Sequence, residues 1–106
     1  MKTVYISGPM TGHKDYNFPT FFAAEDKLRA SGYEVINPAR IEHQDKDNWA
    51  ACMRLAITEM MRADMVATLP WWHQSRGAVT EVALAARLTI PIVNLQELTK
   101  CAGSEE

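Results

Sequence analysis

Short β-branched runs alternate with longer segments of helical periodicity, and this alternation constrains the fold more than any other feature of the sequence. The predicted strands cover residues 3–6, 33–36, 65–69 and 90–95, and the predicted helices cover residues 18–31, 49–60 and 78–88. Strands separated by helices of this length pair in parallel through right-handed crossovers, with helices on both faces of the sheet. The sequence therefore predicts an α/β fold, a small Rossmann-like domain.

Local signals indicate how these helices begin and pack. Asn17 is predicted to cap the first helix, with Pro19 in its first turn. The first helix is expected to bury a stripe made of Phe18, Phe21, Phe22 and Leu28. The third helix is expected to pack through Val79, Val82, Ala83 and Ala86. The charged segment 40–48 predicts a solvated loop.

The expected strand order is the flavodoxin-like order 2-1-3-4. In this order the chain reverses its direction across the sheet between the first and third strands, so that a crevice opens at their carboxyl ends. We expect residues 7–12 and residues 70–77 to line this crevice.

Length and charge exclude several classes of protein. We expect one domain at residues 1–100, with a frayed tail at residues 101–106. Eleven Lys and Arg against thirteen Asp and Glu provide no basic excess for duplex nucleic acid. No apolar run approaches the ~18–20 residues of a membrane span, so a soluble, cytoplasmic protein is expected. Cys52 and Cys101 lack disulfide spacing and are interpreted as reduced thiols.

Glu81 is the most informative polar residue. Its neighbours one helical turn away are Gly77, Ala78, Leu84 and Ala85, and none of them can pair with a carboxylate. A buried, unpaired carboxylate costs several kcal/mol, so an acid on this face beside a crevice is a candidate for function. An exposed helix residue at the edge of the fold is the alternative.

Ser75, Arg76 and Gly77 precede the same helix. Ser75 is predicted to be its N-cap, and the unpaired N–H groups of the first turn form a natural anion site. A capping serine without a ligand is the alternative. The run from Gly8 to Gly12 matches neither a Walker sequence nor a dinucleotide fingerprint, so no nucleotide cofactor is expected.

The other polar and aromatic residues give weaker indications of function. Trp71 and Trp72 suggest either a stacking surface for a base or a subunit contact. The histidines lie in three separate loops without ligand spacing, at His13, His43 and His73. No metal site is therefore expected. Asp64 is interpreted as a turn residue at the amino edge of the sheet.

Three blocks of sequence together resemble a known family. They are the run from Tyr5 to Gly12, the run from Tyr33 to Pro38, and a third block in which Leu69-Pro70 is followed by Ser75-Arg76-Gly77-Ala78 and Glu81. The chain resembles a short phage- and prophage-associated family of unassigned function. That family is related to the nucleoside 2-deoxyribosyltransferases and the deoxynucleoside 5′-monophosphate N-glycosidases.

The resemblance implies an N-glycosidic bond hydrolase or transferase that acts on (deoxy)nucleoside 5′-monophosphates. It implies that Glu81 attacks the anomeric carbon of the sugar and that Tyr5 holds this carboxylate in position. The substrate-binding residues that it implies are Gly8, Pro9, Met10, Ser75, Arg76 and Gly77. It also implies a homodimer or a larger homo-oligomer, without a cofactor or a metal.

The chain departs from these enzymes at two positions. Ala56 stands where they carry an aspartate that assists sugar binding and base departure, and Thr11 stands where the monophosphate glycosidases carry a basic residue. A nucleotide-binding or sequestering module with weak or no catalysis therefore remains the alternative function.

Overall fold

The computed structural model describes residues 1–42 and 47–103. Its strands are β1 (Thr3–Ser7), β2 (Glu34–Ile36), β3 (Met65–Thr68) and β4 (Ile92–Asn94). Its α-helices are α1 (Phe18–Ala30), α2 (Trp49–Met60), α3 (Arg76–Arg87) and α4 (Leu95–Gly103), and its short 3-10 helices are η1 (Lys14–Asn17), η2 (Pro38–Arg40) and η3 (Trp72–Gln74). Within the described ranges, no helix combines the length and the apolar character needed to cross a membrane.

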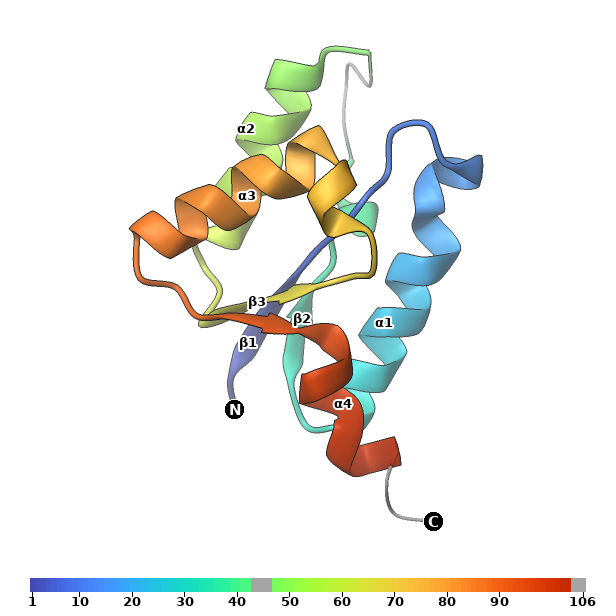
Figure 1. Ribbon diagram of the computed structural model, residues 1–106, viewed down its shortest axis with the longest axis vertical. Coiled ribbons are helices and arrows are strands. Elements are labelled where there is room, and N and C mark those ends of the chain that lie inside the picture. Colours follow the sequence, from blue (N-terminus) through green and yellow to red (C-terminus); the bar gives the residue numbers. More distant parts are fainter. Residues whose placement is uncertain (43–46, 104–106) are drawn as a thin grey trace.

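The four strands form a parallel sheet in the order β2-β1-β3-β4, which confirms the predicted topology. Figure 1 shows α1 and α4 on one face of this sheet and α2 and α3 on the other. β1 is central, because it pairs with both β2 and β3. Helix α4 was not predicted, and Cys101, the expected start of a frayed tail, lies within this helix. The rest of that tail, and residues 43–46 of the predicted loop 40–48, lie outside the described residues.

Alternation along β1 divides the apolar core between the two faces of the sheet. Val4 and Ile6 pack with Phe21 and Leu28 of α1 on one face. Tyr5 projects to the opposite face, where its cluster also contains Met60, Val66 and Ala85. Every second residue of a strand faces the same layer, so the residue after Ile6, Ser7, shares the face of Tyr5.

The packing face of α3 differs from the prediction. Its buried residues are Ala78, Glu81 and Ala85, whereas Val79 is 42% exposed and Ala83 and Ala86 are also exposed. The prediction packed this helix through Val79, Val82, Ala83 and Ala86 and left open whether Glu81 faces the crevice or solvent. In the structure Val82 is half-buried and Glu81 is turned inward, where Tyr5 and Ser7 of β1 donate hydrogen bonds to it. A buried carboxylate with such partners is tolerated.

The start of α1 also differs from the prediction. Asn17 adopts a left-handed conformation (φ 62°) and makes no side-chain cap. Its amide instead donates to the carbonyl oxygen of Pro9 at 2.9 Å, which ties the loop after β1 to the start of the helix. In the predicted stripe, Phe21 and Leu28 are buried, but Phe18 and Phe22 are only half-buried.

A buried carboxylate also joins α1 to η2. Glu25 is 4% exposed and accepts hydrogen bonds from Arg29 Nε and Arg40 Nε, each at 2.8 Å, and from Asn37 Nδ2 at 3.0 Å. Burial raises the pKa of this carboxyl, but the hydrogen bonds from Arg40, Arg29 and Asn37 outweigh burial and lower the pKa to about 2. The cluster holds η2, and with it Pro38, against the first helix.

Candidate active site

A cavity of about 110 Å³ lies at the carboxyl ends of the strands, between the loop after β1, α2 and the start of α3. This is the point where the strand order reverses, and therefore the predicted crevice. Its lining residues are Gly8, Met10, Thr11, Phe21, Pro38, Trp49, Cys52, Met53, Ala56, Ser75, Gly77, Ala78 and Glu81. The cavity thus combines an apolar wall with one carboxylate.

The Glu81 carboxylate faces this cavity and is held by two hydroxyl groups. The Tyr5 hydroxyl donates to Oε2 at 2.7 Å, and the Ser7 hydroxyl donates to Oε1 at 2.7 Å. Glu81 is 6% exposed, while Tyr5 and Ser7 are fully buried. The alternative in which Glu81 is an exposed helix residue is therefore wrong.

Burial changes the acidity of both groups in this pair. Burial raises the pKa of Glu81 above its ordinary value, and the hydrogen bonds from Ser7 and Tyr5 oppose that rise. The pKa of Tyr5 is raised well above its ordinary value, first by burial and then by the charge of Glu81. Tyr5 therefore remains a protonated donor to the carboxylate over a wide pH range.

Ser75 is the N-cap of α3, as predicted. Its hydroxyl oxygen accepts a hydrogen bond from the N–H of Ala78 at 3.2 Å, and the residue lines the cavity beside Gly77. A Cβ added at Gly77 would lie 3.3 Å from Met53 Sδ, so α2 and α3 meet closely here. The start of α3 therefore forms one wall of the cavity.

Replacing Ser75 tests the cap. We expect Ser75→Ala to lower the free energy of unfolding by about 1 kcal/mol, because the first turn of α3 loses an acceptor. Urea unfolding measures this change. Ser31→Ala, which removes the hydroxyl that donates to the carbonyl oxygen of Lys27 at the end of α1, is a second variant for comparison. An unchanged unfolding midpoint in Ser75→Ala would contradict the capping role.

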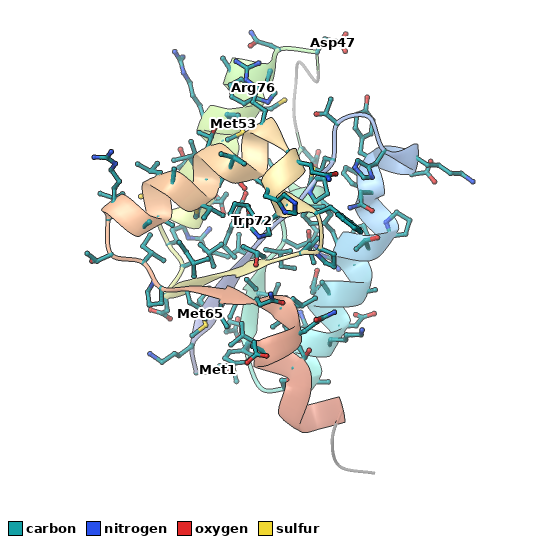
Figure 2. All side chains as sticks on the ribbon, viewed as in Figure 1. Met1, Asp47, Met53, Met65, Trp72 and Arg76 are labelled. Atoms are coloured by element: carbon teal, nitrogen blue, oxygen red, sulfur yellow. The ribbon has the colours of Figure 1, made fainter. Side chains whose placement is uncertain are left out.

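Two of the predicted substrate-binding residues do not line the cavity. Arg76 places its guanidinium 3.7 Å from the centre of the Trp49 ring, a cation–π contact between the first turns of α3 and α2. Figure 2 shows Arg76 and Met53 at the same end of the molecule. Pro9 is buried, and its carbonyl oxygen accepts from Asn17. The predicted residues that the structure brings together at the cavity are Gly8, Met10, Ser75, Gly77 and Glu81, with Tyr5 behind the carboxylate.

Gly8 lines the cavity, but its lack of a side chain also has a packing cause. A Cβ added at Gly8 would lie 2.7 Å from both Cβ and Cδ1 of Leu69. We expect Gly8→Ala to destabilise the protein by about 1–2 kcal/mol, because the residue that follows β3 would have to move. Denaturant unfolding measures this effect. An unchanged midpoint would show that Leu69 adjusts without cost.

Sequence reasoning missed Ser7 as a site residue and assigned it only to the loop at the crevice. The signal that could have identified it is strand periodicity, because Ser7 stands two residues after Tyr5 and so shares its face. The spacing of Trp49, Cys52, Met53, Ala56 and Met60 in the sequence predicts a helix with one face in the core. In the structure Ala56 and Met60 are buried, whereas Trp49, Cys52 and Met53 are only half-buried and line the cavity.

The remaining candidates in the described part of the chain do not line the cavity. Among the described residues, no three His, Cys, Asp or Glu side chains gather as a metal site would require, and His43 is outside those residues. Asp64 Oδ2 accepts from the N–H of Thr3 at 2.8 Å, at the amino edge of the sheet. Trp71 is 62% exposed and Trp72 is half-buried.

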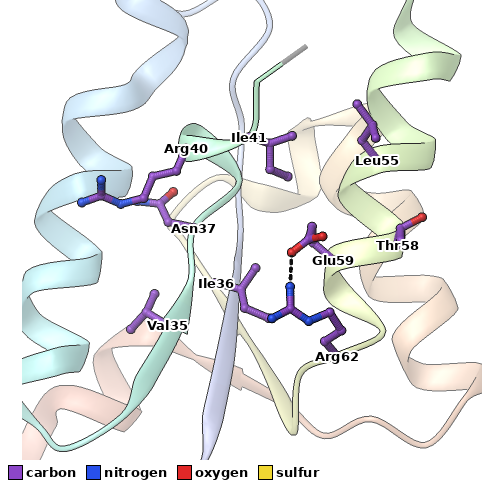
Figure 3. Close-up of a pocket in the computed structure, with 9 residues that line it drawn as sticks. All are labelled: Val35, Ile36, Asn37, Arg40, Ile41, Leu55, Thr58, Glu59 and Arg62. Carbon is purple, nitrogen blue, oxygen red and sulfur yellow. Dashed lines mark hydrogen bonds and ion pairs between the residues drawn. The ribbon is translucent and has the colours of Figure 1, made fainter.

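A larger hollow of about 400 Å³ lies on the other side of α2, against β2 and η2 (Figure 3). Ile36, Ile41 and Leu55 contribute apolar surface, and the ion pair between Glu59 and Arg62 lies beside them. This hollow contains no part of the Glu81 site.

Comparison with known proteins agrees with this architecture. The family described as "Domain of unknown function (DUF4406)" matches residues 2–94. No curated protein matches the chain. A solved structure of a 2-deoxyribosyltransferase from Bacillus psychrosaccharolyticus is similar, with a TM-score of 0.66 and 16% sequence identity over 85% of this chain and 69% of that chain. The two proteins thus share a Rossmann-like fold. Because the family match covers most of the length of this chain, the chain belongs to the DUF4406 family.

Proposed function

We propose that the protein cleaves or transfers the N-glycosidic bond of (deoxy)nucleoside 5′-monophosphates, with Glu81 as the nucleophile. The observation that carries this proposal is the Glu81 carboxylate, which is buried, faces a cavity and accepts hydrogen bonds from Tyr5 and Ser7. A carboxylate in this setting can offset the positive charge that develops on a sugar ring and can form a covalent intermediate with it. The shared fold with a 2-deoxyribosyltransferase also supports the proposal.

The proposed reaction has two steps. A Glu81 oxygen bonds to the anomeric carbon while the bond from that carbon to the base nitrogen breaks. The electron pair leaves with the base, which takes a proton from water. Water then attacks the same carbon, the ester bond breaks, and the carboxylate is restored as the attacking water releases a proton. A sugar phosphate and a free base result, and a second base in place of water gives the transferase reaction.

The proposed site for the 5′-phosphate is the start of α3. The first-turn N–H groups of a helix favour an anion, and Ser75 brings a hydroxyl to the same wall of the cavity. Ser75→Gly separates binding from stability, because glycine at an N-cap costs only a few tenths of a kcal/mol relative to serine. We expect a higher KM for a monophosphate with this variant and little change for the matching nucleoside.

The direct test is to incubate the purified protein with each ribo- and deoxyribonucleoside 5′-monophosphate and to follow free base by chromatography. Release of base from at least one nucleotide is expected. The same reactions with a second base added distinguish transfer from hydrolysis. Absence of base release from every nucleotide would exclude the enzymatic proposal.

Ala56 favours a second candidate, a module that binds a nucleotide without turnover. Ala56 is buried and lines the cavity. The nucleoside 2-deoxyribosyltransferases and related glycosidases that the sequence resembles carry an aspartate at this position. An alanine cannot deliver a proton to a departing base. Calorimetry with the same nucleotides, showing binding without base release, would support this candidate, and the absence of any binding would exclude it.

We also propose that the protein assembles as a homodimer or a larger homo-oligomer. The resemblance described above motivates this proposal, and Leu55, Met61 and Trp71, which are 43%, 41% and 62% exposed, are candidates for contacts between subunits. Light scattering during size-exclusion chromatography measures the mass in solution. A monomeric mass at micromolar concentration would contradict the proposal.

A further inference from the structure

Ser7 carries a buried hydroxyl at the end of β1, one of the two inner strands of the sheet. β1 is paired on both sides, and Ser7 stands opposite Thr68 in the register with β3. Ser7 is fully buried, and burial of a hydroxyl without a partner would cost free energy. Its hydrogen bond to Oε1 of Glu81 meets that requirement. The serine is thereby directed at one oxygen of one side chain.

Tyr5 and Ser7 approach Glu81 from the same side. They lie two residues apart on β1 and project to the same face of the sheet. Neither belongs to the described lining of the cavity, whereas Glu81 does. The two hydroxyls therefore hold the carboxylate from the sheet, and they leave its opposite side to the cavity.

Two donors restrain a carboxylate more than one donor does. The last torsion of a glutamate side chain is broad, so a single bond from Tyr5 to Oε2 would let the carboxylate turn about that contact. A second bond to Oε1 fixes the plane of the group. We propose that Ser7 is a positioning residue, which acts with Tyr5 to hold the Glu81 carboxylate in one orientation toward the cavity. The catalytic consequence rests on the proposed function, but the orientation itself does not.

Other titratable groups near Glu81 also affect its titration and must be considered when Ser7 is replaced. Tyr5 faces it from β1, and Cys52 lines the same cavity from α2. Glu59, also on α2, adds a charge that raises the pKa of Tyr5. The Ser7 hydroxyl has no charge of its own, so its removal takes a hydrogen bond from Glu81 and changes no charge around it.

The test follows the carboxyl carbon of Glu81 by ¹³C NMR as pH is varied, with the signal assigned by its loss in Glu81→Gln. We expect Glu81 to titrate at higher pH in Ser7→Ala than in the native protein, because the Ser7 bond lowers the pKa of this carboxyl. Ser31→Ala, the same substitution outside the cavity, should leave the titration unchanged. An unchanged midpoint in Ser7→Ala would overturn the proposal.

Kinetics supply the second measurement. We expect Ser7→Ala to lower kcat about tenfold, which corresponds to the loss of one hydrogen bond to a charged group, with KM nearly unchanged. A native kcat would overturn the catalytic consequence. If Ser7→Ala does not fold, Ser7→Cys keeps a weaker donor of similar size and is judged by the same titration. If the native protein releases no base, the proposed function fails, while the titration still decides the role of Ser7.

Discussion

Glu81→Gln should abolish base release, with a loss of at least ~10³ in kcat on any nucleotide that the native protein cleaves. Glutamine keeps the size of the side chain but cannot form the glycosyl ester. Chromatographic measurement of free base gives the rate. Activity of the native protein should also fall as pH drops through a pKa above the ordinary value for glutamate, because burial raises the pKa of Glu81 and the nucleophile is the ionised form.

Glu97→Gln provides the matched control, because Glu97 is exposed on α4 and lies outside the cavity. It should leave base release unchanged. Undiminished release by Glu81→Gln would remove Glu81 as the nucleophile.

The same Glu81→Gln variant should be more stable than the native protein at neutral pH. A carboxyl whose pKa is raised by folding contributes stability below its unfolded pKa and loses it as pH rises through the folded value. The ionised native residue therefore weakens the fold at neutral pH, and glutamine avoids this cost. Thermal unfolding should show a higher midpoint temperature for Glu81→Gln than for the native protein at neutral pH but not at acidic pH. Such a result is expected for a residue that serves function at a cost in stability.

Glu25→Gln should cause the largest loss of stability among the substitutions considered, about 2–3 kcal/mol at neutral pH. The native carboxylate accepts from Arg29, Arg40 and Asn37, and glutamine replaces one acceptor oxygen with a donor that opposes an arginine. The two arginine side chains are 49% and 61% exposed, so solvent screening keeps the loss below that of a fully buried pair. Urea unfolding measures this change.

The pH dependence of stability distinguishes this ionic role from simple packing. Folding lowers the pKa of Glu25 from 4.5 to about 2, so its contribution is present above pH 4.5 and is lost as pH falls toward 2. The native protein should therefore lose stability across that range, and Glu25→Gln should lose less. Parallel curves for the two proteins would contradict the assignment of this acid transition to Glu25.

Local pattern was enough to predict most of the fold. The helical and strand periods differ, so the three crossover helices and the four strands could be located. The order β2-β1-β3-β4 was expected as a common order of such folds, and the structure confirms it. The prediction failed at α4, because residues 90–95 were assigned to one strand. Asn94 Oδ1 accepts from the N–H of Gln96 at 3.3 Å, and this capping signal at the start of the helix was overlooked. It also failed at Asn17, whose side chain bonds to Pro9 rather than capping α1.

The candidate site was predicted only in part, because some of its contacts join residues far apart in the sequence. The capping role of Ser75 depends on a residue three positions away and was predicted correctly. The position of Arg76 depends on a ring from α2, since its guanidinium lies over Trp49, and no local rule indicated this contact. Ser7 was overlooked because a serine at the end of a strand looks like the start of a loop.

The order of apolar and polar residues determined by itself that this chain forms a parallel sheet with a crevice at its reversal point, because helix and strand periods are properties of neighbouring residues. Only the tertiary structure decided that Glu81 is turned inward. Its partners Tyr5 and Ser7 lie 76 and 74 positions away in sequence, and folding alone brings their hydroxyls within hydrogen-bond distance. These two hydroxyls, and no neighbour on α3, provide the hydrogen bonds that a buried carboxylate requires.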